Sequence, residues 1–151
     1  MEIKVTNFIL NNPFGVKQLD AQLMFIYPAL QEFKKLKTPT IVAYNVVKSI
    51  GVVEKALKEY ETTRITICES LCEKDKDDKP VIEGKIYKFT EENKKEFQLK
   101  WTELLNTEIT LDIFPINQSD IDSLKEINIH CYETLLNNGF ILDDSNKNTG
   151  K

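Results

Sequence analysis

The sequence predicts an α+β fold, in which a long central helix is packed by shorter helices beside a small mixed β-sheet. Residues 38–72 carry apolar side chains at alternating spacings of three and four, which is the a/d pattern of a helix seam. The segments 2–10, 81–89 and 108–114 show the alternation, or the β-branched and aromatic content, typical of strands. At 151 residues the chain is expected to form a single domain over residues 1–142.

The first ten residues are predicted to form a strand with one buried face. Ile3, Val5 and Ile9 lie on the same side of an extended chain. The stretch Asn11-Asn12-Pro13-Phe14-Gly15 then ends the strand, because asparagine, proline and glycine favour turns.

Two short helices are predicted next. Residues 16–27 carry apolar side chains at helical spacing, and Pro28 is expected to end or kink this helix, because proline lacks a backbone donor. Residues 28–37 restart the pattern, with one apolar face formed by Leu30, Phe33 and Leu36. Both helices are expected to pack along the long helix and to leave the far end of its seam bare.

The long helix is expected to be capped by Thr38, with Pro39 in its first turn. At roughly 1.5 Å per residue it would be about 50 Å long, more than a small domain needs to bury its own core. The seam consists of Ala43, Val46, Ile50, Val53, Leu57, Tyr60, Arg64, Ile67 and Leu71. Its bare end predicts a partner, either another protein or a second copy. The predicted partner-binding residues are Val53, Leu57, Tyr60, Arg64, Ile67 and Leu71.

Two residues break the seam's pattern. Gly51 costs about 1 kcal/mol relative to alanine in a helix, so it either admits another backbone or kinks the helix. Arg64 stands among apolar neighbours, so its charge either reaches solvent along a packed stem or is paired and fixes register or partner choice.

A charged loop is predicted at residues 73–80. Its aspartates do not form a calcium loop, because counting from Asp75 puts Pro80 where glycine is needed and Ile86 where the bidentate glutamate is needed. Residues 81–89 then form one strand, or two short strands about Gly84.

A helix over residues 91–106 is predicted on the face of the sheet. Thr90 can cap it, and Glu91 and Glu92 favour the positive end of its dipole. Its apolar stripe, which we expect to be core, consists of Phe97, Trp101, Leu104 and Leu105.

The chain is expected to end with a strand, a helical region and a tail. Residues 108–116 alternate up to the strand-ending Pro115. A helical region begins at Ser119 or Asp120 and stops at Asn137-Asn138-Gly139, in the manner of a C-cap. Residues 143–151 are polar and are expected to be disordered.

No constellation of residues predicts an enzyme. The chain has one histidine, His130, and its neighbour Cys131 points about 100° away from it on a helix. Cys68 and Cys72 could share a zinc ion with these two, but no CxxC pair occurs, and packing of the thiols is the simpler interpretation. We therefore expect no catalytic residues, no metal and no cofactor.

The charge distribution argues against direct nucleic-acid binding. Residues 1–72 carry nine Lys/Arg against seven Asp/Glu, and residues 73–151 carry eleven against seventeen. A broad phosphate-binding surface needs clustered basic residues. No signal peptide or membrane-spanning apolar run is apparent, and three cysteines suit a reducing compartment, so a cytoplasmic protein is expected.

Two stretches, AYNVVKSIGVVEKALKEYETTRITICESLCEKDKDDKP and IYKFTEENKKEFQLKWTELLNTEITLDIFPI, carry a family resemblance. They resemble small proteins of unknown function encoded by bacteriophages and prophages of low-GC Gram-positive bacteria. The resemblance covers residues 40 to about 117. It implies a phage or mobile-element origin and a site of action in the cytoplasm of the bacterial host, and it defines no catalytic residues.

The expected function is that of a non-enzymatic, phage-encoded protein-binding module. It would act on a host or satellite protein, as an inhibitor of defence or an antirepressor does, through its long helix and as a homodimer or a complex. The alternative is a structural component of the virion, in a tail or connector.

Overall fold

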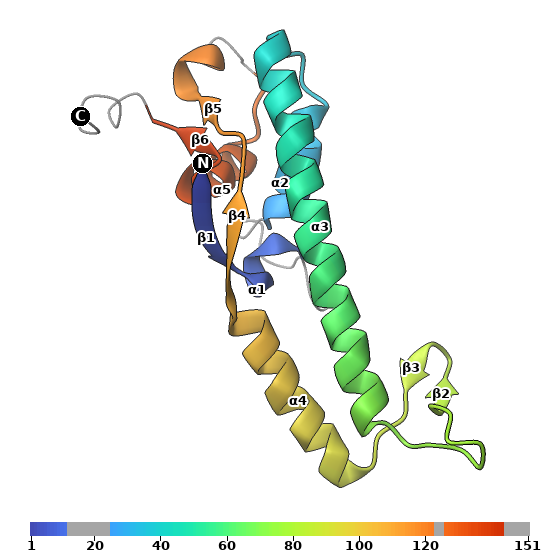
Figure 1. Cartoon of the computed structure of the whole chain (residues 1–151). Helices are drawn as coiled ribbons and strands as arrows, with labels where there is room; N and C mark the ends of the chain where they lie inside the picture. Colours follow the sequence, from blue (N-terminus) through green and yellow to red (C-terminus); the bar gives the residue numbers. More distant parts are fainter. Residues whose placement is uncertain (12–24, 123–125, 144–151) are drawn as a thin grey trace. The chain divides into compact units, whose positions relative to one another are not determined.

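The structure, a computed structural model, describes residues 1–11, 25–122 and 126–143 (Figure 1). It confirms the predicted α+β class, with a long helix, shorter helices and small sheets. The helices are α1 (Asn7–Leu10), α2 (Ile26–Lys34), α3 (Thr40–Leu71), α4 (Glu91–Asn106) and α5 (Ile129–Asn137), with a 3-10 turn, η1, at Gln118–Asp120. The strands are β1 (Glu2–Thr6), β2 (Ile82–Glu83), β3 (Ile86–Tyr87), β4 (Glu108–Asp112), β5 (Ile116–Asn117) and β6 (Ile141–Leu142).

The chain divides into two compact units, and each is described by itself. The first unit contains Met1–Leu57 together with Glu108–Lys151, and the second contains Lys58–Thr107. The predicted helix over residues 16–27 and the predicted disordered tail fall mostly or wholly outside the described residues.

The long helix α3 is continuous from Thr40 to Leu71 and passes through Gly51 without a break. The predicted cap at Thr38 is wrong by one residue, because the carbonyl of Pro39 accepts the first helical hydrogen bond, from Ala43 N at 3.0 Å. Ala43 itself is exposed and Val42 is buried in its place. A straight helix has 3.6 residues per turn, whereas the a/d pattern repeats every 3.5 residues. The stripe of residues that α3 buries therefore shifts gradually away from the predicted seam.

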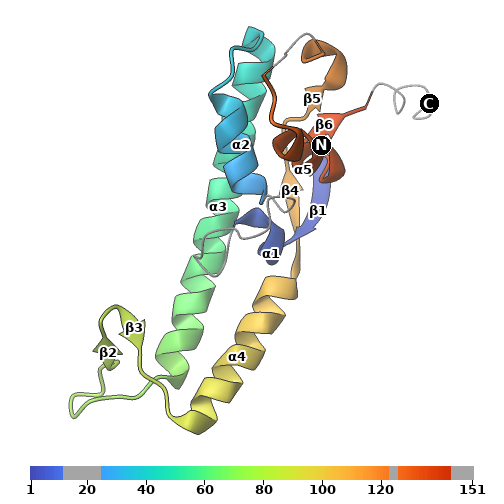
Figure 2. The same cartoon turned by 180° about the vertical axis from the view of Figure 1, so that it is seen from behind.

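The core of the first unit lies between α3, α2, α5 and the β1–β4 pair (Figures 1 and 2). Leu30 and Phe33 of α2 are fully buried, as their predicted apolar face requires. The helix predicted to restart at Pro28 begins two residues earlier, at Ile26, so Pro28 lies in the first turn of α2, where a backbone donor is not needed.

The β1–β4 pair is antiparallel, with Ile3 opposite Leu111 and Val5 opposite Ile109. Ile3 and Val5 are buried as predicted, but the strand ends at Thr6. Ile9 therefore belongs to the short helix α1 and not to the strand.

The predicted inclusion of residues 81–89 in the same sheet is also wrong. Among the described strands, β2 and β3 pair only with each other, and β5 pairs in parallel with β6. The alternative of two short strands about Gly84 is confirmed.

The predicted helical region after Ser119 is divided into η1 and α5. Asn128 starts α5, because its side-chain oxygen accepts from His130 N and Cys131 N at 2.8 and 3.3 Å. The predicted stop at Gly139 is confirmed: its φ is +87°, and Phe140 N donates to Leu135 O. This turn leads directly into β6, which the sequence analysis did not predict.

Candidate functional site

The second unit is a pair of helices joined by polar contacts. The last turns of α3 and all of α4 lie side by side in both views (Figures 1 and 2). Trp101 Nε1 donates to the Tyr60 hydroxyl at 2.7 Å, and Asn93 Nδ2 donates to the Leu71 carbonyl at 3.0 Å. The predicted cap is confirmed, because Thr90 Oγ1 accepts from Asn93 N. The far end of the α3 seam is therefore partly covered by its own chain.

Arg64 is paired within its own helix. Its guanidinium donates to both carboxylate oxygens of Glu61, and Nη1 lies 3.8 Å from Cys68 Sγ. The hydrogen bond from Arg64 lowers the pKa of the Glu61 carboxyl, and the same bond raises the pKa of Arg64. Because the acceptor is three residues away on α3, this pair sets no register between helices.

The predicted partner-binding residues occupy different environments. Val53 is fully buried in the core of the first unit, so it is not available to a partner and its predicted role is wrong. Leu57 is partly buried and packs against the same core. Four residues remain partly exposed in the second unit, namely Tyr60, Arg64, Ile67 and Leu71.

The cysteines are packing residues in this structure. Cys68 and Cys72 are buried, and burial raises the pKa of the Cys68 thiol. Cys131 is also buried, and its thiol donates to the Ala29 carbonyl at 3.1 Å. Burial, with a smaller effect of Glu32, raises the pKa of Cys131 to about 11, so at neutral pH it is a thiol rather than a nucleophilic thiolate.

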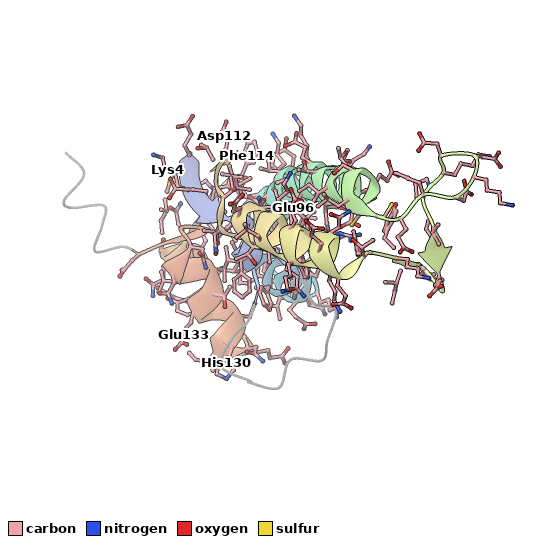
Figure 3. The ribbon with its side chains drawn as sticks, turned by 90° about the horizontal axis from the view of Figure 1, so that it is seen from below. Lys4, Glu96, Asp112, Phe114, His130 and Glu133 are labelled. Atoms are coloured by element: carbon pink, nitrogen blue, oxygen red, sulfur yellow. The ribbon has the colours of Figure 1, made fainter. Side chains whose placement is uncertain are left out.

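No His130–Cys131 pair forms, since the Cys131 thiol is directed to Ala29 O. Figure 3 shows His130 and Glu133 on α5, away from Lys4 and Asp112 of the β1–β4 pair. Within the described part of the chain, no three His, Cys, Asp or Glu residues lie close enough to hold a metal ion.

The β2–β3 hairpin lies at the surface of the second unit. Its two turn residues, Gly84 and Lys85, both have positive φ values of 55° and 75°, the signature of a type I′ turn. This turn matches the twist of the flanking strands, although the positive φ costs a lysine about 1 kcal/mol. Register follows from the turn, with Ile82 opposite Tyr87 and Glu83 opposite Ile86.

The base of the hairpin is fastened to the chain that follows α3. Glu73 N donates to Lys88 O at 2.7 Å, and Val81 N donates to Glu73 O at 2.9 Å. Lys88 N donates to Val81 O at 3.0 Å. The backbone of the hairpin is thus held by hydrogen bonds at its base as well as at its turn.

The anchored hairpin exposes two large apolar side chains. Ile82 is 52% exposed and Ile86 is 71% exposed. Directly opposed residues of an antiparallel pair share a face, so Ile82 lies on the Tyr87 face and Ile86 on the Glu83 face. One continuous strand over residues 81–89 would place both isoleucines on one side, whereas the two-residue turn places them on opposite faces.

A second apolar surface lies on the part of α3 that belongs to the first unit. Ile41 and Tyr44 are each 56% exposed and Val47 is 53% exposed. The Lys48 ammonium lies 4.9 Å from the centre of the Tyr44 ring and 4.3 Å from that of Phe114. Helical spacing could have revealed this stripe, but the stronger seam on the opposite face masks it in the sequence.

Comparisons with known proteins add no relatives: no family model matches the chain, and neither the curated proteins nor the solved structures contain a significant match. None of the helices in the described residues has the length and apolar character required to cross a membrane.

Proposed function

We propose that this chain is a phage-encoded protein-binding module that acts on a host or mobile-element protein, with the β2–β3 hairpin as its main contact. One observation carries the proposal: Ile82 and Ile86 project from a hydrogen-bonded hairpin, and each is more than half exposed. Exposed large apolar side chains on an ordered backbone are what a protein interface buries.

The energetics favour a rigid hairpin over a flexible loop as the contact. Burying an isoleucine side chain is worth about 1.5–3 kcal/mol. Ordering a flexible loop on binding would offset part of that gain, whereas the type I′ turn and the bonds at Glu73 hold this backbone before binding. Two isoleucines on opposite faces suit a partner that receives the hairpin in a cleft.

The remaining predicted residues support this contact. Tyr60 accepts the Trp101 indole N–H, and the Tyr87 hydroxyl of the hairpin lies 3.5 Å from Glu69 of α3. Ile67 and Leu71 are partly exposed on the same helix and are further apolar residues at the surface of the second unit. The long helix then serves mainly as the frame of the contact.

A phage origin and action in the host cytoplasm are part of the proposal and rest on the family resemblance of residues 40–117. A non-enzymatic role fits a surface that offers shape and hydrophobicity instead of reactive groups. The virion-component alternative makes a separate prediction, namely abundance in purified phage particles.

The test begins with affinity capture from lysate of infected or lysogenic cells, followed by purification of the captured protein and calorimetry against the full chain. Ile86→Gln should weaken binding about tenfold or more, because a contact at the centre of an interface carries much of its energy. Leu99→Gln is the matched control, since Leu99 is a 62% exposed apolar residue of α4.

Equal affinities of wild type, Ile86→Gln and Ile82→Gln for the purified partner would refute the role of the hairpin. Copies of the chain in purified virions, at the stoichiometry of a structural protein, would favour the alternative function.

A further inference from the structure

The strand β1 is paired on one side only. Among the described strands it is hydrogen-bonded to β4 alone, and the two form an antiparallel sheet. In both views β4 lies between β1 and α3, so β1 forms the outer edge of this sheet (Figures 1 and 2). Backbone groups of an edge strand that point away from its neighbour have no partner within the sheet.

The register of the β1–β4 pair identifies which backbone groups point outward. Met1 N donates to Ile113 O at 3.0 Å, and Ile113 N donates to Met1 O at 2.9 Å, so these residues form a hydrogen-bonded pair. Such pairs alternate with non-hydrogen-bonded pairs along an antiparallel ladder. Glu2, which lies opposite Asp112, and Lys4, two residues further on, therefore belong to the second kind. Their N–H and C=O groups point away from β4.

The side chains of these two outward residues are exposed and carry opposite charges. Glu2 and Lys4 share the exposed face of β1, since the alternate residues of this strand are the buried ones. The residue that β4 places opposite Glu2 is another carboxylate, Asp112, which accepts from the Met1 ammonium at 2.9 Å. Within the part of the chain that the structure describes, neither Glu2 nor Lys4 forms an ion pair.

We propose that the free edge of β1 pairs antiparallel with β1 of a second copy, which joins the sheets of the two chains into one. A strand edge is complementary to another extended backbone, because such a backbone supplies donors and acceptors at the same repeat. The two-fold axis passes between the two copies of Ile3. Each Glu2 then forms a hydrogen-bonded pair with Lys4 of the other copy.

Charge identifies a second copy as the occupant and selects the register. Directly opposed residues of an antiparallel pair share a face, so Glu2 and Lys4 form opposite-charge pairs on both sides of the axis. A shift of two residues in one direction would place Glu2 against Glu2, and in the other direction Lys4 against Lys4. Both shifts set like charges directly opposite each other, which is destabilising. The edge of β1 is therefore self-complementary, as an isologous interface requires.

The same register covers an exposed apolar side chain. Met1 is 51% exposed, and alternation along the strand places it on the same face as the buried Ile3 and Val5. In the dimer Met1 lies opposite Val5 of the other copy, and the two copies of Ile3 lie opposite each other. Apolar contacts on one face thus accompany the charge pairs on the other.

The inference goes beyond the proposed function, because it concerns β1 in the first unit and not the hairpin. Dimerisation can therefore be measured without a host protein. Pairing of two short strands is a small interface, so we expect a dimer of micromolar affinity that weakens as salt is added.

Sedimentation velocity of the full chain over a concentration series tests the proposal. Wild type should convert from monomer to dimer, and Lys4→Pro should weaken the dimer about tenfold or more, because proline removes an outward N–H in each copy. Lys4→Ala is the matched control, since it keeps this N–H and should weaken the dimer less. The circular dichroism of dilute Lys4→Pro should match that of wild type, because the lost N–H does not point to β4.

A charge-swap series tests the register. Lys4→Glu and Glu2→Lys should each weaken the dimer, because each places like charges opposite each other. The double variant should restore the dimer. Lys37→Glu, an equal change of charge at an exposed residue between α2 and α3, should have no effect.

Hydrogen exchange locates the interface within the chain. The amides of Glu2 and Lys4 should exchange more slowly as the protein concentration rises, because they become hydrogen-bonded only in the dimer. A monomer at every concentration overturns the proposal. So does a dimer that leaves these two amides unprotected, or one that the double charge swap fails to restore, because another surface would then hold the copies together.

Discussion

The interactions that stabilise the first unit internally differ from those that stabilise the second. The first unit has a continuous apolar core that includes Leu30, Phe33 and Phe140, all at 1% exposure or less. In the second unit the only buried hydrophobic residues among those described are Cys68, Cys72 and Leu105. Hydrophobic burial is the dominant stabilising contribution in folding, so the first unit should carry most of the stability.

Directional contacts take the place of a core in the second unit. The Trp101–Tyr60 bond, stacking of Phe97 with Phe89 and Trp101, and the backbone bonds of Glu73 define its geometry. Such contacts contribute less net stability than core burial, but they specify geometry. The unit that displays the exposed hairpin is therefore the one that hydrophobic burial stabilises less.

The largest predicted effect comes from truncating a buried side chain in each unit. Phe33→Ala should lower the free energy of unfolding by about 3–5 kcal/mol, because the side chain is fully buried. Leu105→Ala should cost less, about 2 kcal/mol, because few buried neighbours surround it in the second unit. Urea denaturation measures both, and equal costs would show that the two units are equally well packed.

Two glycines with positive φ extend the comparison. Gly139→Ala should cost about 2–3 kcal/mol, because φ is +87° and the new Cβ would lie 2.9 Å from Ile3 Cγ2. Gly84→Ala should cost only about 1 kcal/mol, since its φ of +55° is strained but nothing lies within 4 Å. Thermal unfolding of both variants checks the ranking, which a larger loss for Gly84 would reverse.

Alkaline pH should weaken the first unit through Cys131. Its folded pKa of about 11 lies above the value of about 8.5 expected for an unfolded cysteine. Its stabilising contribution is therefore complete below about pH 8.5 and is lost as the pH rises to about 11, a change of about 3 kcal/mol. The difference in unfolding free energy between wild type and Cys131→Ala should shrink over this window, and a constant difference would contradict the assignment.

The smallest predicted effect is local to the second unit. Trp101→Phe removes the 2.7 Å bond to the Tyr60 hydroxyl and should cost about 1 kcal/mol. Hydrogen exchange should accelerate in α4 and in the last turns of α3, while the amides of β1 and β4 keep their protection. Tyr60→Phe should act similarly, and additive losses in the double variant would mean that the two side chains are not coupled.

Periodicity was sufficient to predict the long elements from the sequence. The a/d pattern placed α3 within two residues at each end, and Thr90 marked the start of α4 correctly. Alternation placed Ile3 and Val5 on the buried face of β1. In each case a local rule and the tertiary structure agree, so the signal survives in a single sequence.

The short elements failed because their signals depend on distant residues. β6 is two residues long and exists through pairing with β5, which the sequence around Ile141 does not reveal. The division after η1 depended on Asn128 acting as a cap inside an apparently helical pattern. The exposure of the hairpin isoleucines was not predicted for a similar reason. Alternation predicts a strand, but it does not indicate whether other elements pack on that strand.

The division of the chain has a consequence for synthesis on the ribosome. Residues of the second unit are contiguous, whereas the first unit combines the beginning and the end of the chain. β1 is made before the second unit, whereas its partner β4 emerges only after the whole second unit has been translated. The apolar residues of β1, α2 and the first half of α3 therefore stay exposed on the nascent chain until β4 and the segments after it have been synthesised. Chaperones could bind this exposed hydrophobic surface in the meantime.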